Sequence, residues 1–431
     1  MDHKQENNNY PLILKGTVIW SDENRRYQIV PGGYLIGEAG ICQGVFETLP
    51  DEYKGIPVQD YQDQLIIPGM TDLHVHAPQY GSRGFGMDLE LLEWLNTYTF
   101  PEEAKYKELE YAQKGYSVFV NDLVQSPTTR ACIFATIHKE ATLLLMDLLE
   151  ESGLVTYTGK VNMDRNSPDF LCEKDVQTAL EETIQWIVES RNRYQNTMPI
   201  LTPRFVPSCS DELMRGIRDI MEEYKLPVQS HLSENRNEIA WVHELCPNTA
   251  CYGEAYDQFD LFGSKDPAIM AHCVHSGLRE RKLMKERGTY IAHCPQSNLN
   301  LASGIAPVRT YLEENQKIGL GTDVAGGANL SLFRAATDAI QMSKMYYCYV
   351  DSKKAPLTME EAFYLATRGG GSFFGRVGYF EKGCELDALV LSEQEIPTPK
   401  VLSVEERLER IFYLAEKTAV AHKFVRGKQL Y

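Results

Sequence analysis

Two histidines, His74 and His76, stand two positions apart beyond the apolar run Leu65-Ile66-Ile67. This run, with the Pro68-Gly69 pair after it, is typical of a buried strand, and we expect both histidines at the far end of that strand. Alternate side chains of a strand point to the same side, so the two imidazoles can reach one point. Converging neutral imidazoles are suited to bind a zinc or iron ion. Taken alone, the pair could equally be two polar residues on a loop.

Similar residues stand where later apolar runs end. With the first pair they make up five of the ten histidines, one arginine and two carboxylates: His74, His76, Arg204, His231, Glu234, His272, His293 and Asp323. Each alone is more often structural, because buried histidines are commonly satisfied by hydrogen bonds. As a set in one register they predict a metal site. Three imidazoles and a carboxylate can hold zinc or ferrous iron and leave a place for a water with a pKa of about 7, as metal-assisted hydrolysis requires.

The two carboxylates of this set also have structural interpretations. Glu234 follows His231 by three residues and is well placed to move protons, but it also stands where a helix could begin after Ser233. These two interpretations are compatible. Asp323 follows an apolar strand and could be a helix N-cap instead of a ligand, so its pattern alone leaves both possibilities open.

From Pro68 onward, short apolar runs alternate with amphipathic segments. Together with the strand that ends at His76, we expect eight strands, the others at 131–136, 155–161, 200–206, 227–231, 268–272, 289–293 and 318–323. Helices are expected between them, for example over 211–224 and over 176–194, the latter with Ala179, Ile184, Ile187 and Val188 on one apolar stripe. Eight such units in about 250–300 residues match a TIM-type barrel, whose chemistry sits at the carboxyl ends of its strands.

Short β-type runs mark both ends of the chain. They fall at 12–20, 34–37 and 44–48, and again at 386–391 and 423–430. We therefore expect an α/β fold in which residues 68–374 form a distorted TIM-type (β/α)8 barrel. Residues 1–67 and 375–431 are expected to form a small discontinuous β-sandwich domain.

The composition narrows the class of protein. The net charge is −17, from 60 acidic and 43 basic residues, and no dense Lys/Arg cluster occurs, which argues against a nucleic-acid or membrane partner. No apolar run approaches the roughly 20 residues of a membrane span. The first nine residues are polar, so we expect no export signal. Ten scattered cysteines without a C-x-x-C pattern are expected to be free thiols in the cytoplasm.

Longer motifs resemble the amidohydrolase superfamily and, within it, the guanine deaminase family. The superfamily pattern consists of His74-x-His76, His231, His272 and Gly321-Thr322-Asp323. More specific similarity covers residues 74–80, 91–95, 98–101, 134–138, 202–205, 229–235, 291–295 and 319–327. The Ala-Pro-Gln, Glu-Trp-Leu and Pro-Arg-Phe segments are much more specific for the guanine deaminase family than the metal pattern of the superfamily.

The resemblance implies an enzyme, a homodimer that hydrolyses guanine to xanthine and ammonia. It implies one Zn²⁺ per chain, with Fe²⁺ as the alternative, because no lysine ends the strand at 200–206 where two-metal relatives carry one. The implied metal ligands are His74, His76, His231 and Asp323. The implied catalytic residues are Glu234, His272 and Asp323, and the implied substrate-binding residues are Gln79, Arg204, Phe205, His231, Glu234 and Asp323.

Two other functions remain as alternatives. One is a different deaminase or chlorohydrolase of this superfamily, acting on cytosine, a pterin, a thioadenosine or a triazine; Gln79 and Arg204-Phe205 argue against it. The other is a barrel without activity that binds a partner protein, which the intact ligand set and Glu234 argue against.

A Tyr-rich segment at 345–347 is expected to lie in the dimer contact. No feature of the loop at 257–266 indicates how access to the site is controlled.

Overall fold

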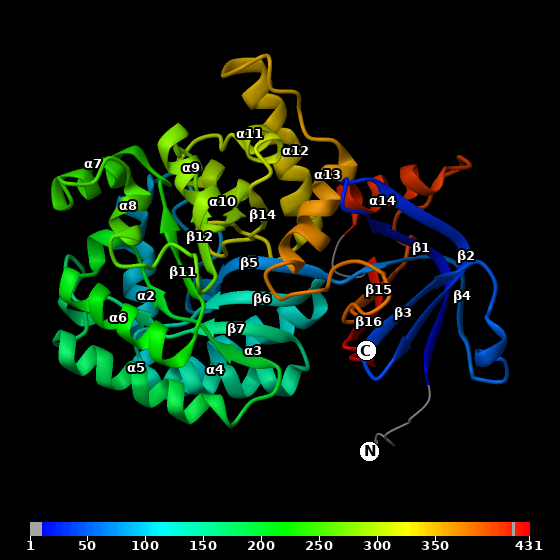
Figure 1. Ribbon diagram of the computed structural model, residues 1–431, viewed down its shortest axis with the longest axis horizontal. Helices are drawn as coiled ribbons and strands as arrows, with labels where there is room; N and C mark the ends of the chain where they lie inside the picture. The colour runs from blue at the N-terminus through cyan, green and yellow to red at the C-terminus, as the bar shows by residue number, and fades with distance from the viewer. Residues whose placement is uncertain (1–10, 416–418) are drawn as a thin grey trace.

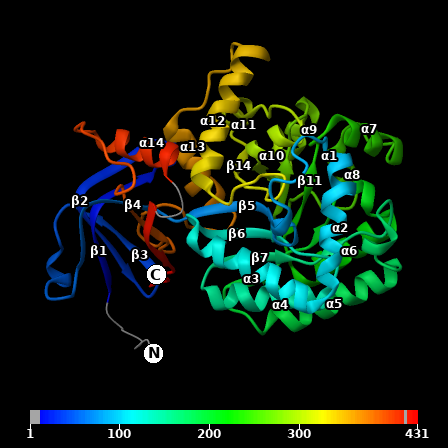
Figure 2. The same ribbon diagram turned by 180° about the vertical axis from the view of Figure 1, so that it is seen from behind.

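The computed structural model describes residues 11–415 and 419–431 and consists of a small sheet beside a larger part with parallel strands and helices (Figure 1). The same two parts are seen from behind in Figure 2. Residues 1–10, the polar start of the predicted small domain, and residues 416–418 lie outside the described residues. Among the described helices, none combines the length and the apolar character of a membrane span.

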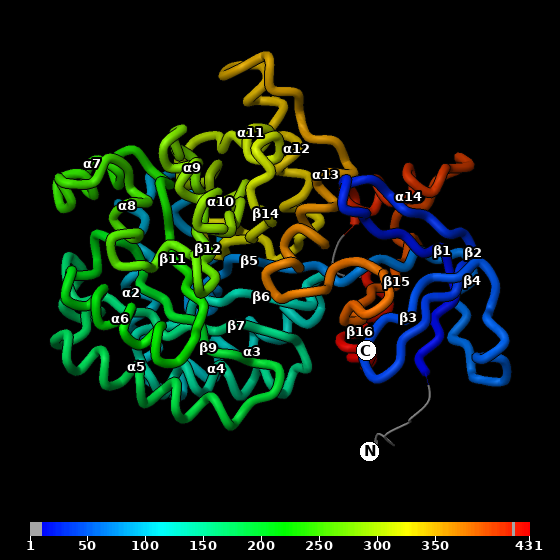
Figure 3. Tube along the Cα trace, in the orientation of Figure 1, coloured from blue at the N-terminus to red at the C-terminus, as the bar shows by residue number. Residues whose placement is uncertain are grey.

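Seven strands from both ends of the chain form the small sheet, in the order β17-β16-β15-β4-β1-β2-β3. Their bounds are β1 (Leu12–Ser21), β2 (Tyr27–Glu38), β3 (Ile41–Phe46), β4 (Gln59–Pro68), β15 (Ala388–Leu391), β16 (Val420–Val425) and β17 (Lys428–Gln429). Neighbours are antiparallel except for β1 and β4. Strands from the N-terminal and C-terminal segments therefore share this sheet and meet where β4 pairs with β15 (Figure 3).

The larger part is built on parallel strands. One sheet has the order β5-β6-β7-β9, a second has the order β11-β12-β13-β14, and β8 pairs with β10. Their bounds are β5 (Met70–His76), β6 (Thr128–Phe134), β7 (Val155–Gly159), β8 (Val161–Asn162), β9 (Thr197–Pro199), β10 (Thr202–Pro203), β11 (Val228–Leu232), β12 (Ala268–His272), β13 (Tyr290–His293) and β14 (Lys317–Leu320). All seven residues of β5 and of β6 are buried, as expected for strands covered on both faces. The fold is thus mixed α/β.

Helices surround the parallel strands (Figures 1 and 2). Their bounds are α1 (Leu91–Trp94), α2 (Phe100–Ala104), α3 (Leu109–Gln125), α4 (Lys139–Ser152), α5 (Val176–Arg191), α6 (Asp211–Tyr224), α7 (Arg236–Leu245), α8 (Tyr252–Asp257), α9 (Leu278–Arg287), α10 (Pro295–Asn300), α11 (Val308–Glu313), α12 (Leu332–Tyr349), α13 (Met359–Tyr364) and α14 (Val404–Leu414). The start of α5 is fixed by the Asp175 side chain, which accepts a hydrogen bond from the Thr178 N–H. Ala179 and Ile187 lie on its buried face as predicted, but Val188 is 54% exposed. The predicted stripe was too wide, because each residue turns the helix by about 100°.

The apolar run at 65–67 and the histidines lie in different sheets. β4 ends at Pro68 in the small sheet, and β5 begins at Met70 in the parallel sheet. The prediction of one continuous strand is therefore wrong. Between the two strands the Gly69 N–H donates to the Asp387 carbonyl at 3.0 Å, and a Cβ on this glycine would lie 2.2 Å from the Thr129 hydroxyl. Only glycine fits where the chain passes from one sheet to the other.

The strand predicted over 200–206 is interrupted. β9 ends at Pro199 and β10 contains only Thr202 and Pro203. Proline has no N–H to donate to a neighbouring strand, so the two prolines shorten the ladder on both sides. Arg204 and Phe205 consequently follow the strand and lie beyond its end.

A buried ion pair joins the two parts of the molecule. Arg130, on β6, donates from Nε and one terminal nitrogen to the Asp387 carboxylate at 2.7 and 3.1 Å. Both side chains are buried. Asp387 directly precedes β15, so this pair connects the first parallel sheet to the small sheet.

Replacing Arg130 by Met is expected to lower the free energy of unfolding by about 3–5 kcal/mol, because the Asp387 carboxylate is left buried without its partner. Urea unfolding followed by circular dichroism measures this loss. Arg193→Met is the matched control, since its 2.5 Å ion pair with Asp147 is half exposed and should contribute about 1 kcal/mol or less. Equal losses in the two variants would contradict a structural role for the buried pair.

Candidate metal centre

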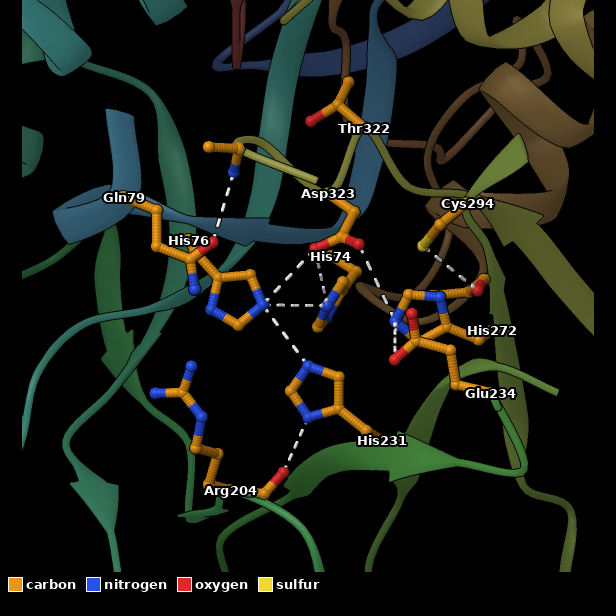
Figure 4. Close-up of polar contacts among 12 residues, drawn as sticks. His74, His76, Gln79, Arg204, His231, Glu234, His272, Cys294, Thr322 and Asp323 are labelled. Carbon is orange, nitrogen blue, oxygen red and sulfur yellow. Dashed lines mark hydrogen bonds and ion pairs between the residues drawn. The ribbon is translucent and has the colours of Figure 1, made fainter. Parts of the chain in front are cut away.

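Three imidazoles and one carboxylate meet where the strands of the two parallel sheets end (Figure 4). His74 and His76 come from β5, His231 from β11, and Asp323 from the turn after β14. The Nε2 atom of His76 lies 3.1 Å from that of His74 and 3.3 Å from that of His231. The Oδ1 atom of Asp323 lies 3.2 Å from His74 Nε2 and 3.3 Å from His76 Nε2.

These spacings fit the coordination of one metal ion. Ligand atoms about 2.0–2.1 Å from a tetrahedral zinc ion lie about 3.3 Å from one another. His231 is already oriented for this purpose, because its Nδ1–H donates to the Arg204 carbonyl at 2.6 Å and its Nε2 lone pair faces the cluster. The residues present therefore suit a bound zinc or iron ion.

The protonation states also suit metal binding. Burial lowers the pKa of His74, lowers that of His76 to about 4, and lowers that of His231 well below its usual value, so the imidazoles are neutral. Burial opposes ionisation of Asp323, but the neighbouring His74 and His76 side chains hold its pKa well below the usual range. Neutral imidazoles and an ionised carboxylate are the forms that bind a metal.

Asp323 owes its position to β5 rather than to a helix. Its backbone N–H donates to the His74 carbonyl at 2.8 Å, and its φ of 47° lies in the left-handed region. The Asp72 carboxylate accepts hydrogen bonds from the backbone and the hydroxyl of Thr322 at 3.0 and 2.5 Å, which fixes the turn before Asp323. The next long helix, α12, has Ser331 as its N-cap, so the interpretation of Asp323 as a helix cap does not hold.

Glu234 and His272 stand beside the cluster. His272 Nε2 lies 3.4 Å from Glu234 Oε2 and 3.7 Å from Asp323 Oδ2. The Nδ1–H of His272 donates to Asn298 Oδ1 at 2.9 Å, and the Ser303 hydroxyl donates to Glu234 Oε1 at 3.1 Å. Burial, with the nearby charge of Asp323, raises the pKa of Glu234 to about 8, so a protonated carboxyl group is available near neutral pH.

Glu234 does not cap α7. That helix begins at Arg236, with Asn235 as its N-cap and Glu238 as the reciprocal partner of the capping box. The side chain of Glu234 instead points toward His272 (Figure 4). The interpretation of Glu234 as a residue that stabilises the helix start is therefore wrong for its side chain. Only the backbone of Glu234 lies just before the helix.

The three predicted purine-binding residues, Gln79, Arg204 and Phe205, line one cavity with His76, His231, Glu234 and Asp323. Apolar walls are supplied by Leu91, Trp94, Leu95 and Leu301. The Phe205 ring packs edge-on against Trp241, with centroids 6.2 Å apart. The cavity thus has flat apolar surfaces, a few polar groups and the candidate metal ligands in one place, as small-molecule sites do.

His293 is the member of the predicted set that the structure does not bring to the cluster. It ends β13 and is buried, but it belongs to none of the candidate metal-binding groups among the described residues. Neither ring nitrogen has a hydrogen-bond partner there, and burial lowers its pKa to about 3. Residue type and strand position were predicted correctly, but the direction of the side chain was not.

Sequence reasoning missed four supporting residues, namely Asp72, Glu103, Asn298 and Ser303. Asp72 could have been found, since it stands two positions before His74 and shares its side of β5. The other three lie far along the chain from the groups they contact, and no local pattern marks them.

Parallel strands that present a His₃Asp set at their ends, beside a cavity for a small molecule, define a metal-dependent hydrolase. The chain belongs to the amidohydrolase family, whose family model matches residues 65–430. It is 38% identical to guanine deaminase of Dictyostelium discoideum over 97% of this chain and 98% of that protein. Its structure resembles that of guanine deaminase from C. acetobutylicum with bound guanine in the active site, with a TM-score of 0.95, 45% identity and coverage of 98% and 100%. E. coli guanine deaminase gives a TM-score of 0.86, 29% identity and coverage of 98% and 99%.

Proposed function

We propose that this chain is a guanine deaminase, which converts guanine and water into xanthine and ammonia. One observation carries the proposal: three of the four candidate metal ligands, His76, His231 and Asp323, line the same cavity as the Arg204 and Gln79 side chains. The relatives named in the comparison support it, because they match the chain over nearly its whole length. Guanine would lie with its C2 amine toward the cluster and its C6 carbonyl toward Arg204.

His74, His76, His231 and Asp323 would hold one Zn²⁺ or Fe²⁺ ion. Such an ion lowers the pKa of water to about 7 and so supplies hydroxide at neutral pH. Asp323 would accept the proton released by water, through the Oδ2 atom that faces His272. Glu234 would donate a proton to ring nitrogen N3 as C2 is attacked, and His272 would hold the new hydroxyl in place. Asp323 would then pass its proton to the exocyclic amine, the C2–N bond would break to release ammonia, and the proton of the new hydroxyl would return to Glu234 as the C2 carbonyl of xanthine forms.

Metal analysis tests the ligand set. Protein stripped with a chelator and reloaded with zinc should contain about one equivalent per chain by elemental analysis. His76→Asn should lose most of this metal, because it removes one of four ligand atoms. His293→Asn is the control and should keep its metal, since His293 lies outside the cluster. Two equivalents at full activity, or an unchanged content in His76→Asn, would contradict the single site.

A substrate panel tests the function. The initial rates of ammonia release from guanine, adenine, cytosine and a pterin, and of chloride release from a chlorotriazine, should give the highest kcat/KM for guanine. Adenine has an amine where guanine has its C6 carbonyl, so the Arg204 donors would face a donor and stay unpaired. A clear preference for any other member of the panel would instead favour a different deaminase or chlorohydrolase of the family.

We infer that residues 68–374 form one distorted (β/α)8 barrel in which the two parallel sheets are halves. On one side the Ile200 N–H donates to Thr158 at 3.2 Å, and the Leu201 N–H donates to Pro227 at 2.9 Å. These bonds continue the ladder from the first sheet to the second. On the other side the Asp323 N–H donates to His74 and the His76 N–H donates to Val324 at 3.0 Å, which supports closure between β14 and β5.

We also propose that residues 1–67 and 375–431 form one β-sandwich-like domain. The Cys42 N–H donates to the Cys384 carbonyl at 2.7 Å, and the Leu386 N–H donates to Gly40 at 2.8 Å. The outer strand β3 thereby contacts the segment that leads into β15, four strands away in the order of the sheet. Such a contact requires the sheet to fold over on itself.

The protein is proposed to work as a homodimer in the cytoplasm. All ten cysteines are free in the described structure, which suits a reducing compartment. The end of α12 projects from the larger part and exposes Met345, Tyr347, Tyr349 and Val350 (Figure 1). An exposed group of apolar side chains of this kind is typical of a protein contact.

Light scattering at micromolar concentration should therefore give about twice the mass of one chain. Tyr349→Glu should shift the protein toward the monomer, because it places a charge in the apolar contact. The mass of a single chain for the unmodified protein would contradict the dimer.

A further inference from the structure

Glu103, on α2, contacts two of the residues proposed to bind the substrate. Its Oε2 atom accepts a hydrogen bond from one terminal nitrogen of Arg204 at 2.6 Å, and its Oε1 atom accepts one from the other terminal nitrogen at 3.0 Å. Oε1 also accepts a hydrogen bond from the Gln79 amide at 2.8 Å. Glu103 is 1% exposed and does not line the cavity. One carboxylate outside the cavity thus binds both polar side chains that line it.

The pairing determines which donors of Arg204 remain available. A guanidinium group has five N–H donors in a fixed plane. Glu103 takes one from each terminal nitrogen, which leaves the Nε–H and one N–H on each terminal nitrogen. Among the described residues Arg204 has no other side-chain hydrogen bond, and its plane packs over Phe100 with Cζ 5.0 Å from the ring centre. The Nε–H and the adjacent terminal N–H form a second fork on the edge that Glu103 does not occupy.

The orientation of Gln79 is determined in the same way. Its oxygen accepts a hydrogen bond from the Ala325 N–H at 3.2 Å, and its nitrogen donates to the Glu103 carboxylate. A backbone N–H can only donate and an ionised carboxylate can only accept, so the amide cannot be flipped without losing both bonds. One Gln79 N–H then remains for the cavity, next to Arg204 (Figure 4).

We infer that Glu103 is a positioning residue that gives the site its selectivity for purines with an oxygen at C6. Held by Glu103, Arg204 presents a fork of two parallel N–H donors. The C6 oxygen and N7 of guanine are two adjacent acceptors on one edge, the pattern that an arginine fork binds best. A purine without the C6 oxygen offers only one of the two acceptors. This inference depends on the proposed function, because it names the part of the base that Arg204 contacts.

A carboxylate is required at position 103, and its isosteric amide should not replace it. Three N–H donors, two from Arg204 and one from Gln79, converge on its two oxygen atoms. In Glu103→Gln one oxygen becomes an NH₂ group that faces these donors. At least one side chain must then turn away, although the size of residue 103 is unchanged.

The test measures binding of two compounds without the C2 amine, so that no turnover is needed. Hypoxanthine has the C6 oxygen and purine lacks it. Isothermal titration of each into zinc-loaded protein gives the ratio of their dissociation constants. For the unmodified chain we expect hypoxanthine to bind roughly 10–100-fold more tightly, as the loss of one bidentate pair implies. In Glu103→Gln this ratio should fall at least tenfold toward one, with zinc content unchanged.

Glu173→Gln is the matched control. Glu173 is also a buried carboxylate paired with a buried cation, Lys160, at 2.5 Å, but it does not line the cavity. This variant should keep the ratio of the unmodified chain even if it is less stable. If Glu103→Gln does not fold, Glu103→Asp carries the same test, because its shorter side chain must withdraw from at least one partner.

An unmodified chain that binds the two compounds equally would overturn the contact between Arg204 and the C6 oxygen, and this inference with it; whether the chain deaminates guanine is decided separately by the substrate panel. An unmodified chain that prefers hypoxanthine, with the same preference in the Glu103 variant, would overturn only the role of Glu103. An equal fall of the binding ratio in Glu173→Gln would also overturn the role of Glu103, because the effect would then be a general consequence of disturbing a buried ion pair.

Discussion

Glu234→Gln is expected to lower the turnover of guanine by about 10²–10⁴-fold, because it removes the carboxyl group that protonates the ring in the proposed reaction. Glutamine has the same size as glutamate, but its amide cannot act as a general acid. Zinc content should stay the same, since Glu234 is not one of the four proposed ligands. The measurement is the rate of xanthine formation at saturating guanine, with the metal content of each sample determined in parallel.

Glu280→Gln is a suitable control for this change. Glu280 is as buried as Glu234 and accepts hydrogen bonds from the Ser233 hydroxyl at 2.8 Å and the Gly253 N–H at 2.7 Å, but it lies outside the cavity. Burial raises its pKa as well, so the two variants share the loss of a buried carboxyl group. Near-normal turnover of zinc-loaded Glu234→Gln, or an equal loss in both variants, would remove the proton-transfer role.

Arg204→Met should lower kcat/KM for guanine by about 10²–10⁴-fold, because a charge-assisted hydrogen bond to the C6 carbonyl is lost. The structure adds a second effect. Glu103 would stay buried without its partner, so the variant should also lose about 3–5 kcal/mol of stability. Arg204 is not engaged in a surface ion pair, because its carboxylate partner Glu103 is buried.

Arg130→Met separates these two effects. It makes the same substitution in a buried Arg–carboxylate pair that lies away from the cavity, so it should lose stability while keeping kcat/KM for guanine. If Arg204→Met keeps its guanine activity, Arg204 does not bind the base.

The candidate ligands could be predicted from the sequence for a simple geometric reason. A strand repeats every two residues, so His74 and His76 must share a side, and parallel strands bring their carboxyl ends to one edge. His231, His272 and Asp323 were found by the same rule. The rule gives position along the strand but not the direction of the side chain, which is why it also selected His293.

The supporting residues could not be predicted in this way. Glu103 lies 101 residues before Arg204 and follows another glutamate, Glu102, in an ordinary acidic helix start. Only the packing of α2 against the ends of the strands makes it the partner of Arg204. The break at Gly69 has a similar origin, since the glycine is required by the Thr129 side chain that lies against it in the folded chain.

A time course with guanine tests the proposed function most directly. Pure protein carrying one equivalent of zinc is expected to form xanthine and ammonia in equal amounts until guanine is consumed. The same protein stripped of metal should form neither, and activity should return when zinc is added back. If the folded, zinc-loaded chain leaves guanine unchanged, the proposed function is contradicted.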